Sequence, residues 1–83
     1  MTIQLSPSEQ ALWNKLRHRQ DYAISGLYST VYGKQSCPPR VQQMRVGAIV
    51  WRINAKLARA GIRQRIRPGV ERRTYRLIRL RQE

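Results

Sequence analysis

Apolar residues in the middle of the chain recur three or four residues apart, which is the spacing of one buried face of an α-helix. The pattern begins after Arg40 and ends before Gly61, a residue type that commonly terminates helices. We therefore expect a helix over residues 40–60, whose periodic apolar positions are Val46, Ile49, Val50, Ile53, Leu57 and Ala60. Its outward and lateral positions contain no acid and are Met44, Arg45, Ala48, Trp51, Arg52 and Arg59.

The N-terminal part of the chain predicts a shorter helix. Ser6 can cap it, Pro7 suits its first position, and Glu9 is placed to complete a capping box. We expect this helix to extend to about His18 or Arg19. Its inward stripe would contain Leu12 and Leu16, with Ala11 or Trp13 beside them.

A short apolar segment and a second helix come next. Residues 22–24, Tyr-Ala-Ile, favour a single strand, and Ser25 can cap a helix that Gly33 ends. The inward positions of this helix would be Leu27, Tyr28 and Val31. Residues 34–39 predict a loop, because two consecutive prolines cannot lie inside a helix.

After Gly61 the pattern changes to the alternation of β-strands. Residues 62–67 predict a strand with one arginine face, formed by Arg63, Arg65 and Arg67. Residues 68–72 predict a turn, and residues 73–80 a second strand with Tyr75 and Leu77 on one face. The alternation is broken at residues 78 and 80, where we expect either a bulge or the end of strand pairing.

The charge of the chain indicates the class of its partner. The 83 residues suffice for one domain, 1–83, and hold seventeen Lys and Arg against four Asp and Glu, a net charge of +13. A polyanionic partner would offset the resulting self-repulsion. Residues 40–83 alone carry +11, from thirteen cations and two acids. Fourteen of all the cations are Arg, whose planar group pairs with phosphate and with guanine, so nucleic acid is favoured over a merely solvated basic surface.

Residue types for catalysis or metal binding are sparse. Four acids, one His and one Cys are scattered over different predicted elements, and the sequence contains no glycine-rich phosphate loop. We therefore expect neither enzyme activity nor a metal or cofactor. We also expect a cytoplasmic protein, because no apolar run approaches the ~18 residues of a membrane span and the single Cys cannot form an internal disulfide.

The order of these elements predicts an α+β fold, the winged helix-turn-helix. In this fold the third of three helices enters the DNA major groove, and a C-terminal β-hairpin wing touches backbone or minor groove. Parts of the sequence also resemble the C-terminal effector domain of OmpR/PhoB-type response regulators. The matching segments are Leu5-Ser6-Pro7-Ser8-Glu9, Val31-Tyr32-Gly33, Val46-x-Ala48-x-Val50-x-Arg52-Ile53-x-x-Lys56-Leu57, Ile66-Arg67 and Thr74-Tyr75-Arg76-Leu77.

The resemblance implies a winged-helix protein that binds duplex DNA. The small size of the chain leads us to expect a stand-alone protein of the type encoded by phages or mobile elements. The resemblance places Arg52 toward the major groove and Arg67 in the minor groove. Base specificity is not carried over, because Trp51 and Asn54 replace small or basic residues of the family's third helix. Regulation by phosphorylation is not implied either, because the sequence shows no receiver domain.

The candidate DNA-binding residues form two groups. Base edges or phosphates are the expected contacts of Arg40, Gln42, Gln43, Arg45, Ala48 and Arg52 in the third helix. In the hairpin, the residues that we expect to contact phosphates or the minor groove are Arg65, Arg67, Arg72, Arg73 and Tyr75. A solvated side chain is the alternative for each. For Trp51 we expect core packing against the hairpin, with stacking at the interface as the alternative, and for Trp13 and Tyr32 we expect core positions.

These observations together predict a sequence-specific double-stranded DNA-binding transcription regulator. It would occupy an operator or contact RNA polymerase beside a promoter, and a homodimer on repeated half-sites is one arrangement. A small RNA- or ribosome-binding protein is one alternative, although RNA readers usually display several aromatic residues on a sheet and Tyr75 is the single strand candidate here. Another is an RNA polymerase-binding transcription inhibitor that uses Met44 and Trp51 as anchors.

Overall fold

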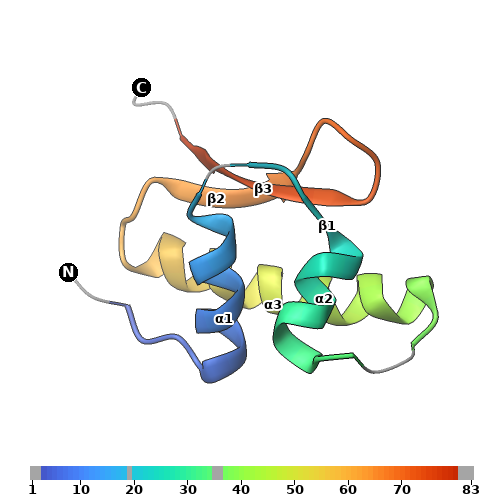
Figure 1. Ribbon diagram of the computed structural model, residues 1–83. Helices are drawn as coiled ribbons and strands as arrows, with labels where there is room; N and C mark the ends of the chain where they lie inside the picture. Colours follow the sequence, from blue (N-terminus) through green and yellow to red (C-terminus); the bar gives the residue numbers. More distant parts are fainter. Residues whose placement is uncertain (1–2, 19, 35–36, 81–83) are drawn as a thin grey trace.

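Three helices are followed by a C-terminal hairpin in a computed structural model that describes residues 3–18, 20–34 and 37–80. The helices are α1 (Pro7–Leu16), α2 (Ile24–Tyr32) and α3 (Pro39–Arg59), and the strands are β1 (Tyr22–Ala23), β2 (Gln64–Pro68) and β3 (Thr74–Arg79) (Figure 1). The strands form one antiparallel sheet in the order β1-β3-β2. This α+β arrangement is consistent with a winged helix-turn-helix, as the element order predicted.

The start of α1 has the predicted capping box. The backbone N–H of Glu9 donates to the Ser6 hydroxyl, and the backbone N–H of Ser6 donates to the Glu9 carboxylate at 2.9 Å. The helix ends at Leu16, so the expected end at His18 is wrong by about half a turn; Arg19 lies outside the described residues. Leu12 and Leu16 are fully buried, as the periodicity predicted.

The start of α2 differs from the prediction. Ile24 belongs to the helix rather than to the strand, and Ala23 is its N-cap, so Ser25 does not cap it. The backbone N–H of Ile24 instead donates to the carbonyl oxygen of Arg73 at 2.9 Å, which ties this helix to the hairpin. The end of α2 is as expected, because Gly33 is its C-cap and has a positive φ of 75°, which favours glycine.

Helix α3 is the longest element and begins one residue earlier than predicted. Pro39 is its first residue, a position where the missing N–H of proline breaks no helical hydrogen bond. The helix ends at Arg59, with Gly61 two residues later in the left-handed conformation. Its buried residues are the predicted apolar positions Val46, Ile49, Val50, Ile53 and Leu57.

The hairpin is more regular than the sequence suggested. β2 and β3 pair without a bulge from Gln64 opposite Arg79 to Pro68 opposite Tyr75, so the bulge alternative is wrong. Pro68 belongs to β2, and the connecting loop is 69–73, not the expected 68–72. Arg73 lies outside β3 with a positive φ of 55°, which removes it from the strand we expected.

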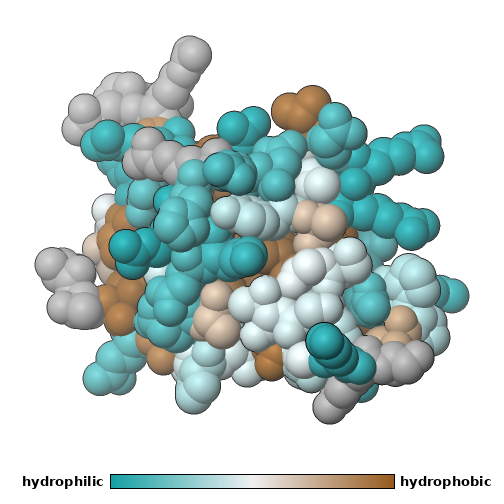
Figure 2. All heavy atoms as spheres, viewed as in Figure 1, coloured by the Kyte–Doolittle hydropathy of each residue, from teal (hydrophilic) through white to brown (hydrophobic). Residues whose placement is uncertain are grey.

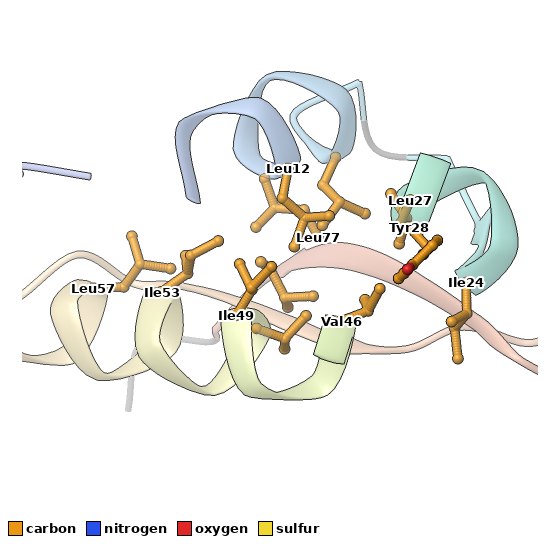
Figure 3. Close-up of a cluster of buried hydrophobic side chains, with 12 residues drawn as sticks. Leu12, Ile24, Leu27, Tyr28, Val46, Ile49, Ile53, Leu57 and Leu77 are labelled. Carbon is orange, nitrogen blue, oxygen red and sulfur yellow. The ribbon is translucent and has the colours of Figure 1, made fainter. Parts of the chain in front are cut away.

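The core lies between the three helices and the inner face of the sheet. Figure 3 shows buried side chains from α1, α2, α3 and β3 pointing toward one another. Trp13, Val31 and Tyr32 are partly buried and pack against this cluster, which agrees with the inward positions predicted for them. The hairpin loop lies at the same end of the molecule as the start of α3 (Figure 1).

Candidate nucleic-acid interface

The outward face of α3 is apolar along its centre. Met44, Ala48 and Trp51 follow one another at the spacing of a single helix face, and all three are exposed. Trp51 has 72% of its surface exposed and Met44 67%. The expectation that Trp51 packs in the core is therefore wrong: the hairpin contacts α3 nearby, at Gly47 and Asn54, and leaves most of the Trp51 side chain uncovered.

Arg45 lies beside this face and contacts α2. Its guanidinium donates to the Tyr28 hydroxyl at 3.3 Å and lies 5.5 Å from the centre of the Tyr32 ring. The pKa of Tyr28 is raised by a hydrogen bond with Cys37 and by burial, so its hydroxyl stays neutral beside the arginine. Arg45 thus links α3 to α2 and is only partly available to an external partner.

Arg52 and Lys56 lie near the buried carboxylate of Glu9. Lys56 Nζ is 2.5 Å from Oε1 of Glu9, and Arg52 Nε is 3.8 Å from Oε2. Burial alone would raise the pKa of Glu9, but the hydrogen bonds from Lys56 and Ser6 and the two positive charges outweigh it, and the pKa is lowered. The sequence assigned Glu9 only a capping role, whereas the structure adds an ion-pair network that joins α1 to α3.

Asn54 joins α3 to the sheet. Its side-chain amide donates to the carbonyl oxygen of Ile66 at 3.0 Å, and its Oδ1 accepts from the Ile66 N–H at 2.8 Å. Because β2 is an edge strand, these backbone groups have no strand partner on that side. The sequence offered no signal for this contact beyond an amide at a half-buried helix position.

Two further candidates contact the protein itself. Arg65 donates from one nitrogen to the carbonyl oxygens of Ile62 and Gln64, both at 2.7 Å, so its guanidinium folds back along β2. Gln42 donates to the Cys37 carbonyl oxygen at 3.2 Å, which closes the loop before α3. Both side chains are half-buried and stabilise local backbone.

The hairpin loop is held by Asp21, a residue that sequence analysis did not single out. Oδ2 of Asp21 accepts from the Val70 N–H at 2.8 Å, and Oδ1 lies 3.3 Å from Nε of Arg76. Gly69 makes room for this carboxylate, because a Cβ at that position would lie 2.6 Å from Oδ2 of Asp21. The loop is therefore fixed relative to β1 and α2.

The start of α3 and the hairpin loop border a common hollow. Arg72, Arg73 and Gln43 line an open space of about 200 Å³ together with the first residues of α2 and α3. Tyr75 lines a neighbouring hollow that shares Gln43, Arg72 and Arg73 with the first. The two predicted groups of candidates thus meet at Gln43, Arg72, Arg73 and Tyr75.

The side chains of several exposed arginines make no hydrogen bond or ion pair with any residue that the structure describes. They lie at both ends of α3 and along the hairpin, and are Arg40, Arg59, Arg67, Arg72, Arg73 and Arg79. In Figure 2, long hydrophilic side chains project from the end of the molecule where the hairpin loop lies. These side chains are available to an anion, unlike those of Arg45 and Arg65.

Neither a search for metal-binding or membrane-spanning features in the described residues nor a comparison with known proteins identifies a function. Within residues 3–18, 20–34 and 37–80, no three His, Cys, Asp or Glu side chains gather as metal ligands. None of the helices in the same ranges has both the length and the apolar character needed to cross a bilayer. Comparison of the chain with protein-family models, curated proteins and solved structures finds no match. Functional inference therefore depends on the residues and their geometry.

Proposed function

We propose that this protein is a sequence-specific double-stranded DNA-binding transcription regulator. The observation that carries the proposal is the pairing of an acid-free exposed face on α3 with unpartnered arginines on the adjacent hairpin. A helix of this kind fits the major groove, which is about 12 Å wide. The hairpin arginines would then lie against the backbone or the minor groove.

The unpartnered arginines would supply most of the affinity. Arg67 and Arg72 on the hairpin and Arg40 at the start of α3 are exposed, so they can pair with phosphates without breaking a contact in the protein. The likeness of the sequence to OmpR/PhoB-type effector domains supports the same orientation of α3 and hairpin. Occupation of an operator or contact with RNA polymerase would be the regulatory step.

A titration against four nucleic acids tests this proposal. Fluorescent random duplex DNA, single-stranded DNA, single-stranded RNA and duplex RNA are titrated at several salt concentrations, and a preferred duplex is then selected from a random pool. We expect the selected duplex to bind at least tenfold more tightly than random duplex, and both more tightly than RNA. Binding to RNA that equals or exceeds binding to every duplex DNA would overturn the proposal in favour of the RNA-binding alternative.

One observation also favours a second candidate, an RNA polymerase-binding inhibitor. The exposed Met44 and Trp51 are residue types that anchor protein interfaces, and arginines border them. In that case Trp51→Ala would abolish inhibition of transcription while DNA binding stays intact. In a regulator that acts through DNA, the loss of regulation would instead follow the loss of DNA affinity.

A further inference from the structure

The centre of the exposed face of α3 carries no side chain that matches guanine. Arg45 points to Tyr28 and Tyr32, and Arg52 points toward Glu9, so the two arginines nearest the centre lean away from it. Three apolar side chains remain there: Met44, Ala48 and Trp51. A DNA-bound α3 would therefore present apolar atoms, not guanidinium groups, to the base edges.

This apolar strip is distinctive within the molecule. The exposed large hydrophobic residues in the described part of the chain are Met44, Trp51 and Val70, and two of the three lie on this single helix face. Arg40 lies four residues before Met44, and Arg59 lies eight residues after Trp51; both are exposed and make no ion pair with any described residue. The strip is thus apolar in its middle and positively charged at both ends.

We propose that this strip reads the C5-methyl groups of thymine in the major groove. The inference rests on the proposed DNA-binding function and names the base feature that α3 recognises. Thymine is the base whose major-groove edge carries a methyl group, and apolar side chains contact it favourably. The positively charged ends of the strip are consistent with this arrangement, because Arg40 and Arg59 would face the phosphates while the middle of the strip faces the bases.

The dimensions of the strip set the length of the site. Met44 and Trp51 are seven residues apart, which is about 10 Å along a helix at a rise of about 1.5 Å per residue. Base pairs repeat about every 3.4 Å, so the strip spans about three base-pair steps. The selected duplex should therefore contain a run of A·T pairs three or four long under α3.

Replacement of thymine by uracil tests the proposal directly, because uracil lacks only the methyl group. The preferred duplex is selected first, and each thymine is then changed singly to uracil. We expect about a fourfold loss of affinity for each methyl group that α3 contacts. Met44→Ala and Trp51→Ala should each remove the thymine preference at one position, so that thymine and uracil bind that variant equally.

Val70→Ala is the matched control, because Val70 is also an exposed large hydrophobic residue but lies on the hairpin loop. It should leave every thymine-to-uracil ratio unchanged. All three side chains are exposed, so thermal unfolding should show the three variants to be as stable as the parent chain.

Two outcomes would overturn the inference, and they differ in what they say about function. If the protein binds a specific duplex but replacement of thymine by uracil does not change the affinity, the proposed recognition of thymine methyl groups is wrong and the proposed function stands. The absence of any duplex preference overturns both. The inference would also be wrong if the Trp51→Ala and Met44→Ala variants kept the thymine preference of the parent chain. The strip would then be a candidate contact surface for a protein partner.

Discussion

The cations of α3 and those of the hairpin are both numerous in the sequence but lie in different surroundings. Along α3, Arg45, Arg52 and Lys56 contact Tyr28 or Glu9 of the other helices. On the hairpin, the side chains of Arg67 and Arg72 are exposed and make no polar contact with any described residue. Arginine thus joins the helices in the middle of α3, at Arg45 and Arg52, and is available to an anion at Arg67 and Arg72 of the hairpin.

Because of this difference, side chains in the middle of α3 should contribute mainly to stability and those on the hairpin loop mainly to binding. A polar side chain on a lateral edge of α3 is coupled to folding, because its partner would lose a contact when it is removed. A side chain on the hairpin loop has no such partner and costs little folding free energy when truncated. Variants in the two regions should therefore change different measurements.

Asn54→Ala should have the largest effect on stability. The two hydrogen bonds to Ile66 are lost and two backbone groups of an edge strand lose their partner, so the free energy of unfolding should fall by about 1–3 kcal/mol. Urea denaturation measures the loss. Asn14→Ala, an exposed amide on α1, is the control and should change stability by less than about 0.5 kcal/mol. Equal effects of the two variants would contradict the anchoring role of Asn54.

Glu9→Gln should have a smaller effect that depends on pH. Glutamine can keep the capping box, but the charge facing Lys56 and Arg52 is lost, and since both cations are partly exposed the cost at neutral pH should be about 1 kcal/mol. The folded pKa of Glu9 is lowered, so its contribution is present above the ordinary value of 4.5 and is lost as the pH falls through the folded pKa.

The measurement is the free energy of unfolding as a function of pH for the parent chain and for Glu9→Gln. The difference between the two curves should shrink on acidification below about pH 4.5. Glu71→Gln, which removes an exposed acid on the hairpin loop, is the control and should change the free energy of unfolding at neutral pH by less than about 0.5 kcal/mol. A constant gap between parent and Glu9→Gln at all pH values would show that the charge of Glu9 is not the cause.

Arg67→Ala should leave stability unchanged and weaken DNA binding. The loss of one phosphate contact should reduce the slope of log affinity against log salt by about 0.9. Arg79→Ala is the matched control, because Arg79 is an equally exposed hairpin arginine at the opposite end of the strands from the loop. If both variants reduce the slope equally, net charge and not position on the hairpin would determine binding.

Arg45→Ala should have the smallest effect of these variants. In contrast to Arg67→Ala, it should lower stability and leave DNA binding unchanged. Loss of the contact with the Tyr32 ring should cost about 0.5–1 kcal/mol of stability, as expected for an exposed cation–π pair. The salt slope should stay within error of the parent value. A clear drop in the slope without loss of stability would return Arg45 to the DNA-binding residues.

Much of the fold was predictable because local patterns determine it. The buried positions of α3 follow from the repeat of Val46, Ile53 and Leu57, and the capping box follows from Ser6 and Glu9 alone. The predictions that were wrong concern features that depend on tertiary contacts. The Ile24 N–H bonds to the distant Arg73 carbonyl, so α2 starts one residue before Ser25. Trp51 is exposed because the hairpin contacts α3 at Gly47 and Asn54 and leaves the indole between them uncovered.

The sequence by itself determined the order of the elements, the apolar faces that form the core, and the concentration of positive charge after residue 39. Periodicity and charge are properties of neighbouring residues, so they can be recognised without a structure. Only the tertiary structure decided which cations are available to a partner. Their contacts come from distant parts of the chain: Glu9 and Lys56 are 47 residues apart, and Asp21 and Val70 are 49 apart. No local pattern records which charged groups folding brings together.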